Sequence, residues 1–198
     1  MCIRDRNIIS VSLVALLIGA AEAAFVMFLV ARPRVVALRG SPPYGWALGL
    51  GIGSMQASYL IYRLFDEQLQ YSEYSGVNAV SVTLAFAISI TSALGHALPA
   101  SWQGAMVLES SRFRPFLLSS IARAALIVCL VLSLFVPLLL LVTLPAIALA
   151  WGPAQMIWLP SGMTPAAKQA FRRTTRQSDK HRKASDERIA GTPVDSEE

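Results

Sequence analysis

The sequence predicts an all-α, polytopic transmembrane helical bundle of four to five spans, followed by a disordered basic C-terminal tail. Hydrophobic residues make up 55% of the chain and charged residues only 15%, whereas about a quarter of a typical soluble domain is charged. Several apolar runs are long enough, at about 18 residues or more, to cross a bilayer as helices. Residues 168–188 hold eight Lys or Arg and three Asp or Glu, a net charge equal to the +5 of the whole chain.

Five apolar segments are the expected spans. They cover approximately residues 7–31, 44–64, 77–98, 117–136 and 138–160. The first is longer than the hydrophobic region of a signal peptide, which has about 7–15 residues. The last two divide one apolar run, which as a single helix would be roughly 60 Å long, about twice the thickness of the hydrocarbon core. We expect a hairpin of two short helices that turns near Pro137–Pro145, with a shallow re-entrant hairpin as the alternative.

Arginines and acidic residues alternate between the loops. Residues 32–39 contain three Arg and no acid, residues 66–73 contain three acids, and residues 112–123 contain three Arg. Because Lys and Arg favour the cytoplasmic side of a membrane, this order predicts five spans with the N-terminus outside and the C-terminus in the cytoplasm. We expect the location to be a bacterial inner (plasma) membrane.

The two ends of the chain differ from the apolar body. The opening hexapeptide MCIRDR resembles adaptor sequence translated as protein, so we expect residues 1–6 to be a non-native leader. An outside N-terminus without a cleaved signal also suggests a missing upstream helix and a parent protein of six or more spans. Residues 161–198 form the expected cytoplasmic tail, and their high charge predicts that most of the tail is disordered. Its basic part either enforces the topology or lies against anionic lipid head groups.

Small residues recur every four positions in three of the expected spans. The second span carries Gly45, Gly49, Gly53 and Ala57, the first carries Ala15, Gly19 and Ala23, and the third carries Ser81, Ala85, Ser89 and Ala93. Positions four apart lie on one face of a helix, and a face of small residues lets helices approach closely in a membrane. We expect these three helices to pack together, with the second span held against the first and the last two spans peripheral.

The same glycines do not form a nucleotide-binding loop. A dinucleotide-binding fingerprint needs GxGxxG between a strand and a helix, and a P-loop needs GK followed by Ser or Thr. The sequence GLGIGS has GxGxG spacing, and the run continues apolar after it. We therefore interpret these glycines as a helix-packing face.

Three polar side chains within the spans are candidates for a substrate or proton pathway: Glu22, Gln56 and His96. An acidic side chain in mid-span costs about 2.5–3.5 kcal/mol on insertion scales, so Glu22 either has a binding role or is a protonated structural group. For Gln56 the alternative is interhelical hydrogen bonding, and for His96 it is an interfacial position. Helical rise separates Glu22 from His96 by about 9 Å in depth, which would require a bridging water. We expect the Arg123 side chain to reach the membrane interface.

These observations predict an integral membrane protein of the transport type, a permease or permease subunit. Its layout resembles six-span ABC-type permeases without their first helix, although no diagnostic motif accompanies the layout. Arg32, Arg34 and Arg39 would dock a cytoplasmic ATPase or another subunit, and an oligomer is a further possibility. The alternative is a non-transporting assembly factor, scaffold or adaptor that acts through its basic tail. We expect no enzyme, catalytic residue, metal, cofactor or nucleic-acid partner, because the sequence shows no metal-ligand spacing, acid pair or nucleophile motif.

Overall fold

The computed structural model describes residues 2–66 and 76–189. Regular structure in these ranges is helical and includes no strand, which confirms the all-α prediction. The chain divides into two compact units, Met1–Gly162 and Met163–Glu198. Four segments are long and apolar enough to cross a membrane: Ser10–Val30, Ala79–Leu108, Phe113–Ser133 and Pro137–Gly162. The first unit is therefore the helical domain of a membrane protein.

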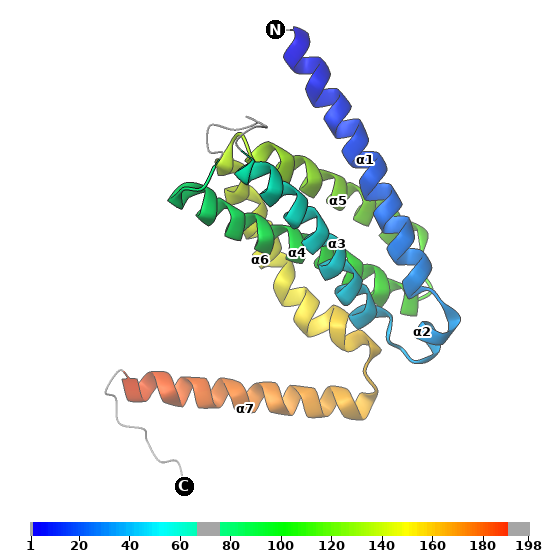
Figure 1. Ribbon diagram of the computed structural model, residues 1–198. Coiled ribbons are helices and arrows are strands. Elements are labelled where there is room, and N and C mark those ends of the chain that lie inside the picture. The colour runs from blue at the N-terminus through cyan, green and yellow to red at the C-terminus, as the bar shows by residue number, and fades with distance from the viewer. Residues whose placement is uncertain (1, 67–75, 190–198) are drawn as a thin grey trace. The chain divides into compact units, whose positions relative to one another are not determined.

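The long helices of this first unit run in alternating directions (Figure 1). In chain order its helices are α1 (Cys2–Val30), α2 (Pro33–Ala37), α3 (Ser41–Phe65), α4 (Ala79–Leu108), α5 (Phe113–Ser133) and α6 (Leu140–Pro153). The α1–α3 connection, the α4–α5 turn and the C-terminal end of α6 lie at one end of the bundle, and the α5–α6 turn lies at the other (Figure 1). The arginine-bearing loops 32–39 and 112–114 are therefore at the same end.

Helix α3 is not among the four apolar segments, since it contains four glycines, two prolines and a glutamine. Its 25 residues are nevertheless long enough for a bilayer, because they extend about 37 Å. The helix lies against α4 along its length, from Ser41 beside Gly104 to Leu64 in a cluster with Leu84. The count of spans is thus four by apolar length and five when α3 is included.

Helices α4 and α5 extend beyond the predicted spans. Helix α4 does not end at Leu98 but continues through Pro99 to Leu108. A proline is tolerated within a membrane helix where neighbouring groups satisfy the freed backbone. Helix α5 begins at Phe113, before the predicted start at residue 117. This earlier start moves every residue of α5 deeper into the bundle than the sequence suggested.

The run of residues 117–160 forms a helical hairpin. After α5 the chain reverses through a 3₁₀ turn, η2 (Pro137–Leu139), and α6 then packs against α4. The reversal lies at the start of the expected Pro137–Pro145 region, because Pro145 is inside α6. The hairpin ends in a π-helical turn, η3 (Ala154–Trp158), and a 3₁₀ turn, η4 (Leu159–Gly162).

The tail contains a helix where we expected mostly disorder. Helix α7 spans Pro165–Ile189 and is largely exposed. Proline is favoured in the first turn of a helix, and Ala, Lys, Arg and Gln, which dominate this segment, have high helix propensity. High charge alone was therefore a poor guide to its backbone. The remaining part of the expected disordered tail, residues 190–198, lies outside the described residues.

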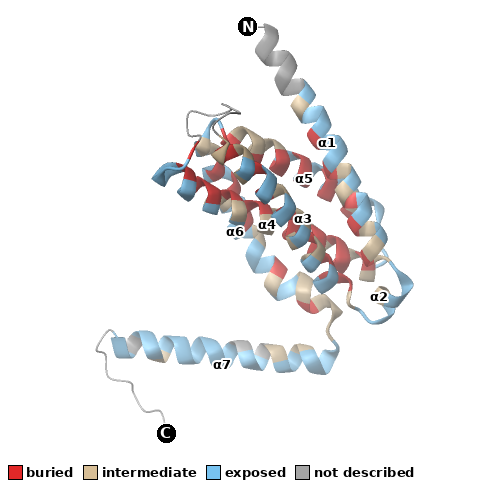
Figure 2. Cartoon of the chain, in the orientation of Figure 1, coloured by how far each residue is buried: buried red, intermediate tan, exposed pale blue. Residues whose placement is uncertain are grey.

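Burial divides the bundle into an interior and a lipid-compatible surface (Figure 2). One interior cluster, near the α5–α6 turn, joins α3, α4, α5 and α6 through Leu60, Leu84, Leu130 and Leu140. Many large hydrophobic side chains are exposed instead, and Leu17, Phe28, Phe86, Leu141 and Leu149 are examples. In a membrane these outward side chains contact lipid, where their exposure carries no penalty.

The glycine face of α3 packs against α4. A methyl group on Gly49 would lie 2.5 Å from the Ala97 Cα, and one on Gly53 would lie 2.7 Å from the Ala93 Cα. Gly45 meets the backbone of Ala100 in the same way. Our expectation that this face holds the second span against the first is therefore wrong: the glycines allow backbone contact with the third span.

The small-residue face of α1 packs against α5. Ala15, Gly19 and Ala23 are buried, and a methyl group on Gly19 would lie 2.8 Å from both the Ser120 carbonyl oxygen and the Ala124 amide nitrogen. The prediction that the fourth span is peripheral is therefore wrong. The regular spacing identified which face of each helix packs, but it carried no information about the partner helix.

Candidate intramembrane polar site

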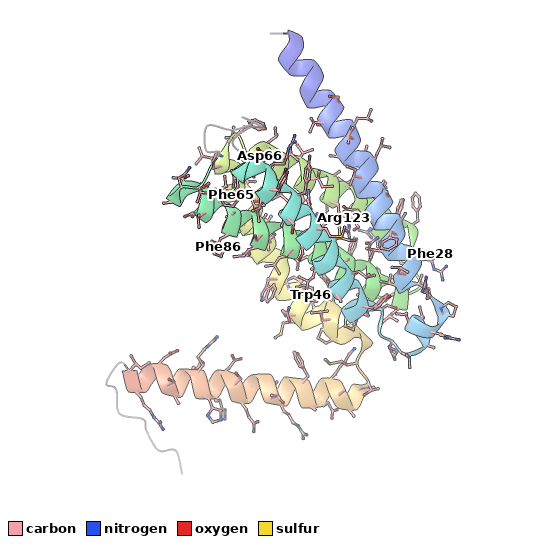
Figure 3. All side chains as sticks on the ribbon, viewed as in Figure 1. Phe28, Trp46, Phe65, Asp66, Phe86 and Arg123 are labelled. Carbon is pink, nitrogen blue, oxygen red and sulfur yellow. The ribbon has the colours of Figure 1, made fainter. Side chains whose placement is uncertain are left out.

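Three ionisable side chains from three helices meet inside the bundle. Glu22 of α1 places Oε2 3.1 Å from Nδ1 of His96 on α4 and 3.4 Å from Nη1 of Arg123 on α5. His96 and Arg123 are fully buried, whereas the Glu22 side chain is 20% exposed. Arg123 is seen between α1 and α3 in Figure 3. We call Glu22, His96 and Arg123 the charged cluster.

Gln56 of α3 extends the charged cluster to a fourth helix. Its Oε1 lies 2.5 Å from Nε2 of His96. On the same side, Ser92 donates its hydroxyl to the Gly53 carbonyl at 2.7 Å and lies 3.4 Å from Gln56 Oε1. His96 is thus held on one ring nitrogen by α3 and on the other by α1.

The small-residue faces explain how these side chains come together. At Gly49 the backbones of α3 and α4 meet beside His96, so that Gln56, two turns further along α3, can reach the imidazole. At Gly19 the backbone of α1 meets the turn of α5 between Ser120 and Ala124, which contains Arg123. Larger residues at either glycine would move the helices apart and lengthen the polar contacts.

The hydrogen-bond acceptors around His96 indicate which of its ring nitrogens carries a proton. His96 Nδ1 cannot both donate to Glu22 and accept from Arg123, which lies 3.3 Å away. Glu22 is nearer, and a carboxylate forms the stronger hydrogen bond, so Nδ1–H donates to Glu22. A neutral imidazole then offers its Nε2 lone pair to Gln56, which would donate with its amide nitrogen, whereas a protonated imidazole donates to Gln56 Oε1. The site can therefore accommodate both protonation states of His96 by rotating one amide group.

Two further contacts complete the surroundings of Arg123 and Glu22. Arg123 Nε donates to Ser119 Oγ at 3.3 Å, whereas the buried Nη2 has no hydrogen-bond partner among the described residues. Gln103 of α4 donates to the carbonyl oxygen of Ala23 at 3.1 Å. Arg123 thus retains one guanidinium nitrogen, with two N–H groups, that its neighbours do not use, and Glu22 is its only ionic partner in the described ranges.

A groove on the surface of the bundle leads to Glu22. It lies between α1 and α3 and has a volume of about 480 Å³. Its walls include Glu22, Phe25, Ile52, Met55, Gln56 and Tyr59. The charged cluster is therefore closed on the side of Arg123 and reachable from outside on the side of Glu22.

The predicted pathway residues differ from the structure in their contacts. Glu22 and His96 are in direct contact rather than separated by a water, because α4 continues to Leu108 and His96 therefore lies well within the helix rather than near its end. Gln56 contacts His96 and not Glu22. Arg123 does not reach the membrane interface: it is fully buried and paired with Glu22. It lies ten residues after Phe113, about 15 Å into α5.

The sequence did contain a signal for Arg123. An intramembrane charge is normally paired with an opposite charge, and Glu22 and Arg123 are an acid and a base within two apolar runs. A base in a second apolar run is therefore a partner that the sequence itself offers for Glu22. Because the fourth span was predicted to start at residue 117, Arg123 was placed near the interface and not at the depth of Glu22.

The arginines of the loop after α1 form a separate basic corner. Arg32, Arg34 and Arg39 are exposed, and the Arg32 guanidinium lies over the Phe28 ring at 5.5 Å from its centroid. Arg32, Arg34 and Tyr44 line a surface depression of about 550 Å³. Arg32 follows Glu22 by ten residues, beyond the C-terminal end of α1, so this corner is separate from the charged cluster.

With this geometry established, we compared the chain with known proteins. No protein-family model, curated protein or solved structure matches it.

Proposed function

We propose that the chain is a transport-type integral membrane protein, a permease or permease subunit, in which Glu22 is the proton- or cation-binding carboxylate. The carrying observation is that Glu22 belongs to a buried ion pair and at the same time lines an open groove. Ionisable groups within membrane helices are costly and usually mark ion or substrate pathways. A carboxylate that faces both the interior and the outside of the bundle can exchange a proton or a cation between them.

The ion pair also provides a way to couple proton uptake by Glu22 to movement of α1 and α5. If Glu22 takes up a proton, the Arg123 guanidinium loses its ionic partner while it is still buried. An uncompensated buried charge costs several kcal/mol, so protonation favours any arrangement of α1 and α5 in which Arg123 finds water or another anion. A small chemical change at Glu22 thereby alters the preferred positions of two helices.

Orientation and partners are part of the same proposal. The loops with Arg32, Arg34 and Arg39 and with Arg112 and Arg114 share one end of the bundle (Figure 1), and we assign this end to the cytoplasm of a bacterial inner membrane. The exposed basic corner would then be the docking surface for a cytoplasmic ATPase or another subunit. We also include an oligomer of the chain in this proposal.

Proton flux into vesicles tests the proposed function. Liposomes that contain the purified full chain and a pH-sensitive dye are given a membrane potential, and internal acidification is followed. We expect Glu22→Gln to lower the flux by about tenfold or more, a barrier change of about 1.4 kcal/mol, whereas Glu109→Gln at the exposed end of α4 should have no effect. Glu22→Gln combined with Arg123→Met removes both charges and serves as a better-folding variant. Flux through the wild type equal to that of protein-free liposomes would contradict proton transport.

A second candidate function is a non-transporting scaffold or adaptor. The observation that favours it is helix α7, an exposed and strongly basic helix outside the bundle. In this reading the charged cluster only fixes the helices, and α7 binds the partner. Truncation after Lys168 should then abolish recovery of the partner while the bundle keeps its thermal stability. A truncated chain with unchanged partner recovery but lost flux would favour transport.

A further inference from the structure

We propose that the groove between α1 and α3 binds a hydrophobic organic cation that enters from the bilayer, with Glu22 Oε1 as the acceptor of its charged group. The inference names a ligand class for the groove and rests on the proposed function only in treating that ligand as a transported substrate. Binding is measurable on the purified protein without any transport.

The Glu22–Arg123 pair turns its negative end toward the groove. Both ionic contacts of Glu22 use Oε2, and Oε1 makes no hydrogen bond to a residue in the described ranges. Glu22 lines the groove, whereas Arg123 is fully buried and does not. A ligand in the groove therefore meets the negative end of the Glu22–Arg123 pair, with the positive charge behind it.

The walls of the groove favour a cation over an anion. They include no Lys or Arg, so an anionic ligand would find no counter-charge. Phe25 lies three residues after Glu22, and its exposed ring can stack on a cation beside the carboxylate. The Tyr59 ring makes a cation–π contact with Arg63, whose guanidinium carbon lies 5.8 Å from the ring centroid. The aromatic wall near Glu22 thus suits a positively charged, flat or bulky group.

The groove is largely apolar and lies on the outer surface of the bundle. Ile52 and Met55 provide an apolar side opposite α1, and Met55 is largely exposed on the outer surface of α3. The volume of about 480 Å³ falls within the usual range for small-molecule sites. A small hydrated metal ion would leave this apolar surface unused. A cation with a hydrophobic body satisfies the carboxylate and the apolar wall together, and it partitions into the bilayer from which the groove is open.

Fluorescence anisotropy of ethidium, a hydrophobic cation with amino groups, tests the proposal on the full chain in detergent micelles. We expect Glu22→Gln to raise the Kd by about tenfold or more, equivalent to about 1.4 kcal/mol. Because Glu22→Gln leaves Arg123 unpaired and can fail to fold, Met55→Trp provides a second variant that fills the groove and leaves the charged cluster intact. We expect it to raise the Kd similarly, whereas Leu17→Trp, on the exposed surface of α1 outside the groove, should leave the Kd unchanged.

The outcomes separate this inference from the proposed function. Ethidium binding that neither Glu22→Gln nor Met55→Trp weakens would overturn the proposed site. Equal binding of a hydrophobic anion of similar size would overturn the electrostatic argument and with it the ligand class. Proton flux that depends on Glu22 without ethidium binding would leave transport standing and reject the organic cation. Groove-dependent ethidium binding without flux would support the site and reject transport.

Discussion

Glu22 and Arg123 are 101 positions apart in the sequence and form a hydrogen-bonded ion pair inside the bundle, with Arg123 Nη1 3.4 Å from Glu22 Oε2. The pair connects α1 to α5, and His96 of α4 joins it through Nδ1. Since Arg123 is fully buried, its charge depends on this one carboxylate for compensation within the described ranges. The pair therefore links the first and fourth long helices of the chain.

Removing one member of this pair should destabilise the bundle more than removing both. Glu22→Gln or Arg123→Met alone leaves a buried charge without its partner, a loss of about 3–5 kcal/mol. In the double variant neither charge remains, and we expect most of the stability to return. Unfolding in detergent micelles with increasing SDS measures the free energy of the wild type and the three variants, which together form a double-mutant cycle.

The exposed Asp179–Arg182 pair of α7, with 3.7 Å between its charged atoms, provides the control for this cycle. Both side chains are more than half exposed, so solvent screens the pair and we expect no measurable coupling. If the losses for Glu22→Gln and Arg123→Met are simply additive, the two charges do not depend on each other, and the pair has no structural role.

Two glycines of α3, two positions apart, should differ strongly in how much an alanine substitution destabilises the bundle. A methyl group at Gly49 would collide with the α4 backbone at 2.5 Å, whereas one at Gly51 would meet nothing within 4 Å. We expect Gly49→Ala to cost about 1–3 kcal/mol through overpacking and Gly51→Ala to be neutral or slightly stabilising, because alanine favours helix. The same SDS unfolding assay compares both variants, and a comparable loss in each would contradict the tight α3–α4 contact.

The sequence predicted which segments form the helices of the bundle better than it predicted which helices pack together. Apolar runs located most of the long helices, because insertion in a membrane depends on properties of each segment by itself. Pairing depends on several segments at once. The faces at Gly19 and Gly49 were recognised, but a four-residue spacing is the same whether the neighbour is α3, α4 or α5.

For the candidate site, too, the sequence identified most of the residues but not the contacts between them. Glu22, Gln56 and His96 stand out because polar side chains are rare in apolar runs. Arg123 was assigned to the interface, since its depth depends on where α5 begins, and helix boundaries are the least certain part of a sequence interpretation. The contact between Glu22 and His96 depends on the packing of α1 against α4, which no single segment encodes.

The tautomer of neutral His96 provides a third prediction. Glu22 should hold the proton on Nδ1, because its Oε2 is 3.1 Å from that nitrogen. The chain contains two histidines, and His181 in the exposed helix α7 serves as an internal reference. Nitrogen-15 NMR of labelled histidine measures which ring nitrogen carries the proton. We expect the Nδ1–H form to dominate for His96 in the wild type and to lose its preference in the Glu22→Gln, Arg123→Met double variant.

In the same experiment, Gln56→Leu distinguishes the effect of the contact at Nε2 of His96 from that of the contact at Nδ1. It removes the contact to Nε2 but leaves Glu22 in place, so the Nδ1–H form should persist while stability falls by about 0.6 kcal/mol, a typical value for an interhelical hydrogen bond. Ser58→Ala, which affects only a hydroxyl bonded within α3, is the matched control. A wild-type His96 that carries its proton mainly on Nε2 would show that Arg123, and not Glu22, is the partner of Nδ1.

Helix α7 provides a fourth prediction, about the membrane surface. Eight Lys or Arg lie between residues 168 and 188, and each basic residue near an anionic surface contributes about 1 kcal/mol of binding. When the full chain is placed in nanodiscs, amide hydrogen exchange in α7 should therefore be slower with anionic than with zwitterionic lipid. Exchange within α4 should be the same in both, which provides the internal control.

Salt distinguishes this electrostatic contact from hydrophobic docking of α7. At about 1 M salt the screening length falls to about 3 Å, so the lipid-dependent protection of α7 should largely disappear. Replacing Arg173, Arg176 and Lys180 with Gln should have the same effect at low salt, because these three residues are exposed on the helix. Protection that persists in high salt, or that is equal with zwitterionic lipid, would show that α7 is protected by apolar contacts and that its charge serves another purpose, such as setting the topology of the preceding spans.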